Sequence, residues 1–155
     1  MVSEYLNLLL ADDDKDDCLF FTEALEELHA SANLTTVHDG EQLMMMLTKK
    51  NADLPNLLFL DLNMPRKNGF ECLAEIKLNK KLNGLRVIIF STSSEQKTIN
   101  LLYENGAQYY IRKPADFGDL KIVIEQALIQ ASQKTMSQPA KEDFIISGRL
   151  KLTAV

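Results

Sequence analysis

The chain has 155 residues, of which 46% are hydrophobic and 25% are charged, a composition typical of one globular domain. Its formal net charge of -5 argues against a broad surface for nucleic acid or for an anionic membrane. No apolar run approaches the roughly 18 residues of a membrane span, no signal peptide is visible, and the two cysteines have no metal-ligand spacing. We therefore expect a cytoplasmic protein without nucleic-acid or membrane partners.

Apolar runs alternate with helical patterns along the first 133 residues. The predicted strands are Leu6–Ala11, Leu34–Val37, Leu57–Leu60, Arg86–Phe90 and Gln108–Ile111. The predicted helices are Asp16–His29, a segment that follows Asp39-Gly40 and runs through Leu43, Met46 and Leu47, Gly69–Lys80, Glu95–Asn105 and Asp116–Gln133. Strands that alternate with helices form βαβ units, so the sequence predicts an α/β fold with a doubly wound, five-stranded parallel sheet and five helices.

The predicted domain covers residues 1–133, and residues 134–155 form a linker and an apolar C-terminal extension without an output domain of their own. Phe144–Ile146 and Leu150–Val155 favour two short strands about a turn at Ser147–Gly148. Because the five-stranded sheet is complete without the extension, we expect it to dock on a helical face or on a neighbouring chain.

Polar side chains follow four of the predicted strands. They are Asp12 and Asp13, Asp61, Ser91, and Lys113, in chain order. The carboxyl ends of parallel strands share one edge of the sheet, where open α/β folds bind ligands. Carboxylates gathered there repel one another, by roughly 4 kcal/mol for two charges ~4 Å apart, so the cluster either raises a pKa or takes up a cation. Oxygen ligands completed by water suit Mg²⁺.

Over about residues 6–130 the chain resembles the receiver domain of two-component response regulators. The matching features occur in the family's order and spacing: the pair Asp12-Asp13, the run Leu-Asp-Leu-Asn-Met-Pro at 60–65 with Gly69 after it, Ser91, and Tyr110 three residues before Lys113-Pro114. The run Asp61–Lys77 is similar to that of single-domain regulators of the phytochrome-associated type, which are similar to the chemotaxis regulator. The resemblance implies the flavodoxin-like fold of receivers.

The resemblance also implies a role for each residue. Asp61 would accept a phosphoryl group from a histidine kinase or a histidine phosphotransfer protein, a transfer that needs mostly positioning and charge neutralisation. Asp13, Asp61 and the backbone carbonyl of Asn63 would hold Mg²⁺, with Asp12 acting partly through water. Lys113 would pair with the phosphoryl oxygens.

The resemblance implies a switch made of Ser91 and Tyr110, and it implies a cis bond before Pro114. Ser91 would donate a hydrogen bond to the phosphoryl group, and Tyr110 would be the rotating aromatic that reports its presence. The Lys113–Pro114 peptide bond would be cis, which is inexpensive only before proline. The protein would be a phosphoacceptor that catalyses its own phosphorylation and slow dephosphorylation, rather than an enzyme in the ordinary sense.

The implied output is phosphorylation-dependent binding to a downstream protein. In the family, the face formed by the fourth helix, fifth strand and fifth helix is the usual switch surface. Ile122 and Ile129 form a second apolar line on the fifth predicted helix and suggest a possible homodimer.

Three alternatives compete with this interpretation. Asp12-x-Asp14 also occurs in phosphatases that form an aspartyl-phosphate, but these have threonine or valine where this chain has Asp16. A calcium loop is disfavoured because Asp17 replaces the loop glycine and a strand precedes it. A pseudo-receiver that binds partners without phosphorylation is disfavoured because Asp61, Lys113 and the acidic pair are retained.

Simpler interpretations also exist for single residues. Asp16 and Asp17 are anions at a helix N-terminus, where the helix dipole favours negative charge. Tyr110 taken alone would be a packing residue, and Lys113 taken alone a solvated surface charge. His29 and His38 have no pattern of partners, so we interpret both as structural or surface residues.

Overall fold

The computed structural model describes residues 5–133 and 137–148. Within these ranges the elements are, in chain order, β1 (Leu6–Ala11), α1 (Lys15–Glu27), β2 (Ala32–Val37), α2 (Gly40–Thr48), β3 (Leu57–Leu60), α3 (Gly69–Leu78), β4 (Val87–Ser91), α4 (Gln96–Glu104), β5 (Tyr109–Arg112), α5 (Phe117–Ala131), the 3-10 helix η1 (Lys141–Asp143) and β6 (Ile145–Ile146). This order confirms the predicted alternation of strands and helices. No helix of the described part is both long and apolar enough to cross a membrane.

The strands form one parallel sheet in the order β2-β1-β3-β4-β5-β6. The register pairs Ala11 with Leu60, Leu60 with Ile89, and Ile89 with Tyr110. All four residues of β3 are buried, which explains why this strand is a continuous apolar run rather than an alternating one. The register therefore brings the carboxyl ends of β1, β3, β4 and β5 to one edge.

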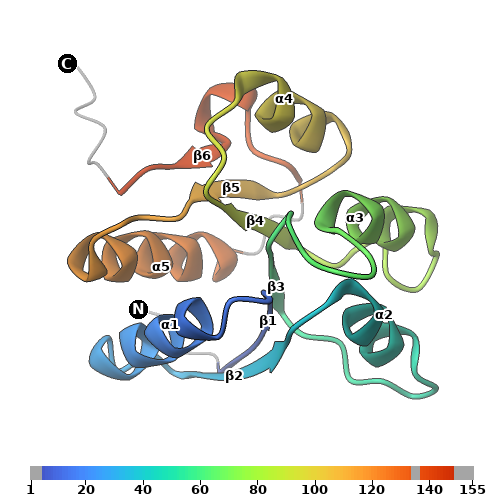
Figure 1. The fold of residues 1–155 in the computed structure, drawn as a ribbon, viewed down its shortest axis with the longest axis horizontal. Coiled ribbons are helices and arrows are strands. Elements are labelled where there is room, and N and C mark those ends of the chain that lie inside the picture. Colours follow the sequence, from blue (N-terminus) through green and yellow to red (C-terminus); the bar gives the residue numbers. More distant parts are fainter. Residues whose placement is uncertain (1–4, 134–136, 149–155) are drawn as a thin grey trace.

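Helices cover both faces of the sheet (Figure 1). One face packs against α1 and α5, and the other against α2, α3 and α4. Under α1, the ring of Phe21 meets the rings of Phe59 and Phe90 edge-on, with centroids 4.9 and 5.6 Å apart. These packed faces fix the strands that carry the polar residues at the sheet edge.

A sixth strand from the C-terminal extension joins the predicted five. Ile145 and Ile146 pair in parallel with Tyr110 and Ile111 of β5. The expectation that this segment docks on a helical face or on a neighbouring chain is therefore wrong. The physical reason is that β5 would otherwise be an edge with open backbone groups, and the Tyr110 N–H donates to the Phe144 carbonyl at 3.0 Å. The second predicted strand, residues 150–155, lies outside the described residues.

Candidate functional site

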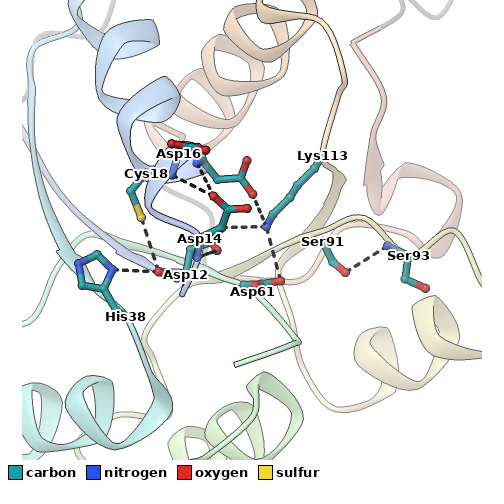
Figure 2. A network of polar contacts seen from close by, with 10 residues as sticks. Asp12, Asp14, Asp16, Cys18, His38, Asp61, Ser91, Ser93 and Lys113 are labelled. Carbon is teal, nitrogen blue, oxygen red and sulfur yellow. Dashed lines mark hydrogen bonds and ion pairs between the residues drawn. The ribbon is translucent and has the colours of Figure 1, made fainter. Parts of the chain in front are cut away.

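The backbone ladder continues past the strand ends and holds the predicted polar residues together. The Asp12 N–H donates to Val37 O and the Asp61 N–H to Ala11 O, both at 3.0 Å. The Lys113 N–H donates to the carbonyl of Ser91, the last residue of β4, at 2.8 Å. The predicted meeting of these side chains at one sheet edge is thus present in the structure (Figure 2).

Three carboxylates form an acidic cluster at this edge. Asp12, Asp13 and Asp61 each place one oxygen within 4.8 Å of the others. Asp12 and Asp61 are buried, whereas Asp13 is exposed, so the cluster has protein on one side and solvent on the other. Carboxylate oxygens with room for water are the donors that Mg²⁺ prefers, so this donor set fits a divalent cation. The Asn63 N–H donates to the Asp61 carboxylate, while a ligand role for the Asn63 carbonyl stays a prediction.

Lys113 is shared among the carboxylates. Its Nζ lies 2.8 Å from Asp12 Oδ2, 2.9 Å from Asp17 Oδ2 and 3.7 Å from Asp61 Oδ1 (Figure 2). The ammonium also lies over the Phe90 ring, 5.3 Å from its centre, where it forms a cation–π contact. Lys113 is therefore not a solvated surface charge. Its ion pair with Asp17 was not predicted, because the sequence indicated Asp17 only as an anion at a helix N-terminus.

Burial dominates the electrostatics of the cluster. The pKa of Asp61 is raised to about 7, chiefly by burial; the charges of Asp12 and Asp13 add to the increase, and Lys113 opposes it. Burial likewise raises the pKa of Asp12, against the hydrogen bond from Lys113. Burial alone would lower the pKa of Lys113, but its bonds to Asp12 and Asp17 outweigh burial and raise it. The ammonium stays charged, and one ammonium does not fully neutralise the carboxylates around it.

Short-range bonds shape the loop between β1 and α1. Asp14 caps α1, because its side chain accepts from the N–H groups of Asp16 at 2.9 Å and Asp17 at 3.1 Å. The Asp12 carboxylate accepts from the Asp14 N–H at 2.9 Å. His38 Nδ1 lies 3.1 Å from the Asp12 carbonyl oxygen, so this histidine supports the loop from β2 (Figure 2). No sequence pattern indicated this contact of His38.

The loop after β3 requires glycine where α3 begins. The Gly69 N–H donates to the Leu62 carbonyl at 2.9 Å. A Cβ at position 69 would collide with the backbone carbonyl of Asp61, so a larger residue would displace the loop that carries Asp61. Asn68 caps the helix and forms a reciprocal capping box with Glu71.

Ser91 and Tyr110, the predicted switch residues, meet at the turn after β4. The Ser91 side chain is fully buried, and its hydroxyl accepts from the Ser93 N–H at 3.2 Å. Tyr110 is also fully buried and donates its hydroxyl to the Ser93 carbonyl at 2.6 Å. Both residues are thus bonded to the same turn, and their roles in switching stay predictions.

The peptide bond between Lys113 and Pro114 is trans, so the implied cis proline is wrong for this structure. The trans form is the intrinsically preferred one, by about 0.5–1 kcal/mol before proline. With this bond in trans, the Lys113 N–H still reaches Ser91 O and its ammonium still reaches Asp12.

Several known proteins are similar to this chain in sequence and in structure. The model of the response regulator receiver domain matches residues 8–125. The response regulator Rcp1 of Synechocystis sp. is 34% identical over 117 residues, which cover 73% of this chain and 80% of Rcp1. The crystal structure of Mn²⁺-bound Rcp1 has a TM-score of 0.75 at 30% identity, covering 87% of this chain and 99% of that one. The phosphorylated cyanobacterial phytochrome response regulator RcpA has a TM-score of 0.77 at 30% identity, covering 88% and 100%.

Proposed function

The chain belongs to the response regulator receiver family of two-component signalling, and on that premise we propose that Asp61 is its phosphoacceptor. The observation that carries this proposal is the position of Asp61. It closes the central strand, is 5% exposed, and lies among Asp12, Asp13 and the ammonium of Lys113. The phosphoryl donor is a histidine kinase or a histidine phosphotransfer protein.

The proposed transfer forms an acyl phosphate. A carboxylate oxygen of Asp61 attacks the phosphorus of the donor phosphohistidine, the N–P bond breaks, and the imidazole leaves with the bonding electrons. Such a transfer depends mostly on positioning and on neutralising charge. Lys113 supplies part of that charge once its ammonium moves from Asp12 and Asp17 to the phosphoryl oxygens. The Ser91 hydroxyl turns to donate a hydrogen bond to the product.

The donor set also supports a resident divalent cation, for which we propose Mg²⁺. Asp12, Asp13 and Asp61 would hold it, together with the carbonyl of Asn63. When bound, the cation neutralises charge on the phosphoryl oxygens. The relative Rcp1 has been crystallised with Mn²⁺, an ion that takes similar oxygen ligands.

Signalling by this protein would consist of binding rather than of chemistry on a separate substrate. We propose that the protein is a cytoplasmic phosphoacceptor. Its partners are the upstream phosphodonor and a downstream protein. A second copy of the chain is a further candidate partner, because Ile122 and Ile129 on α5 are each about half exposed. A pseudo-receiver would bind these partners without taking up phosphate.

Phosphorylation with acetyl phosphate and Mg²⁺ tests the proposal. Intact-mass measurement should show one added phosphoryl group on the wild type and none on Asp61→Asn. The matched control is Asp53→Asn, which makes the same change at an exposed loop residue and should label like the wild type. Absence of labelling on the wild type would favour the pseudo-receiver.

A further inference from the structure

The described part of the C-terminal extension next to β5, Ser137–Ile146, is here called the strap. It lies beside α4 and along the edge of β5 (Figure 1). The Gln138 side-chain amide donates to the carbonyls of Tyr103 and Ala107, both at 2.7 Å. The Tyr103 hydroxyl donates to Pro139 O at 2.7 Å. Directional polar bonds therefore fix the strap's position, in addition to apolar packing.

Phe144 anchors the strap in an aromatic cluster. It is 1% exposed, and its ring meets that of Tyr103 edge-on at 5.0 Å between centroids. The Tyr110 ring lies 6.3 Å from it, and the Tyr110 N–H donates to the Phe144 carbonyl at 3.0 Å. The strap thus covers Tyr110 through both its ring and its backbone.

Tyr110 connects the strap to the sheet edge that carries Asp61. Its hydroxyl donates to Ser93 O at 2.6 Å, and the Ser93 N–H donates to the Ser91 hydroxyl at 3.2 Å. The Ser91 hydroxyl points toward Ser93 (Figure 2). One turn, from Ser91 to Ser93, therefore contacts the tyrosine under the strap and contains the hydroxyl proposed to bind the phosphoryl group.

We propose that the strap is a displaceable cover of the β5 edge and that phosphorylation of Asp61 loosens it, an inference that rests on the proposed function. When the Ser91 hydroxyl turns toward a phosphoryl group, it turns away from the Ser93 N–H. The turn then no longer holds the Tyr110 hydroxyl in its present place, and the packing of the Tyr110 ring against Phe144 is lost.

Loosening of the strap uncovers a surface of definite chemistry. It consists of the open backbone groups of β5 and the rings of Tyr103 and Tyr110. Such an edge fits a protein segment that adds as an extended strand and inserts an aromatic side chain where Phe144 now lies. The strap would then compete with a downstream partner of this kind, and a partner would bind the phosphorylated chain more tightly.

The coupling is reciprocal by linkage, which provides two readouts on the full chain. Saturation with beryllofluoride and Mg²⁺, a mimic of the phosphoryl group, should accelerate hydrogen exchange of the Tyr110 amide by roughly 5- to 150-fold, the range of typical couplings. Phe144→Ala should bind beryllofluoride more tightly than the wild type by a similar factor. The matched control is Ile145→Ala, the next residue of the strap, which is 38% exposed and should change neither readout.

The outcomes separate this inference from the proposed function. Beryllofluoride that binds the wild type without changing Tyr110 exchange would overturn the strap inference alone. A wild type that takes no beryllofluoride would overturn the proposed function and the inference together. If Phe144→Ala does not fold, Gln138→Ala takes its place as the test variant, because it removes only polar bonds of the strap. Equal beryllofluoride affinity in Gln138→Ala and wild type, with faster Tyr110 exchange in the variant, would overturn the coupling.

Discussion

The ammonium of Lys113 lies 2.9 Å from the carboxylate of Asp17, a residue in the first turn of α1. The same ammonium is 3.7 Å from Asp61 Oδ1. Asp17 therefore helps to hold the lysine away from the proposed phosphoacceptor in the unphosphorylated protein. Under the proposed function, phosphorylation would require this ion pair to open, because the ammonium would have to reach the phosphoryl oxygens.

The first prediction is that Asp17→Asn labels faster with acetyl phosphate at fixed Mg²⁺. The side chain of Asp17 is 33% exposed, so the ion pair contributes no more than about 1 kcal/mol, or up to roughly a fivefold rate. Initial rates of mass increase measure the effect. Asp16→Asn makes the same charge change on the exposed side of the same turn and should match the wild type. Slower labelling of Asp17→Asn would contradict a restraining role.

The second prediction concerns pH. The folded pKa of Asp61, about 7, lies above the ordinary 3.8, so the folded state binds more protons between these values. Stability contributed by Asp61 is thus complete below about pH 4 and is lost as the pH rises through about 7. In metal-free buffer, Asp61→Asn should be more stable than the wild type at pH 8, by about 1–3 kcal/mol, and nearly equal at pH 4. Denaturant unfolding at both pH values measures this, and a difference independent of pH would show that Asp61 ionises normally.

The third prediction is that Mg²⁺ stabilises the fold through the acidic cluster. At a concentration tenfold above Kd, binding linkage gives about 1.4 kcal/mol, or roughly 3–6 °C in Tm. Asp13→Ala should lose most of this rise, because its exposed carboxylate completes the ligand set. Asp16→Ala removes a nearby charge outside the cluster and should keep it. A shift that survives in Asp13→Ala would place the cation elsewhere.

The fourth prediction separates labelling from switching. Ser91→Ala should still be phosphorylated, because Asp61 and Lys113 are unchanged. It should show much smaller changes in the NMR signals of Tyr110 on beryllofluoride binding, since only an interaction unique to the modified state can shift the population. Ser94→Ala, at an exposed position, is the control. Equal changes in Ser91→Ala and wild type would exclude Ser91 from the switch.

The sequence predicted the sheet and the meeting of Asp12, Asp13, Asp61 and Lys113 because both follow from local patterns. Buried parallel strands are continuous apolar runs, and their carboxyl ends must share an edge. The residue types that follow those runs are then sufficient to predict an acidic cluster with one ammonium.

Other features depend on tertiary contacts that no local pattern encodes. The apolar run Phe144–Ile146 indicated a short strand, but the position of β6 follows from the open edge of β5 and the burial of Phe144. The pairing of Asp17 with Lys113 depends on how α1 is placed over the sheet. The contact of His38 with Asp12 likewise follows from the folded loops, and the trans bond before Pro114 departs from what the family resemblance implied.

Locating the acyl phosphate tests the central claim most directly. Borohydride reduces an aspartyl phosphate to homoserine, so peptide mass mapping after acetyl phosphate treatment identifies the modified residue. We predict homoserine at position 61 in the wild type and at no other aspartate. Homoserine at Asp12 or Asp13 instead, or its persistence in Asp61→Asn at wild-type yield, would contradict the assignment of Asp61 as the phosphoacceptor.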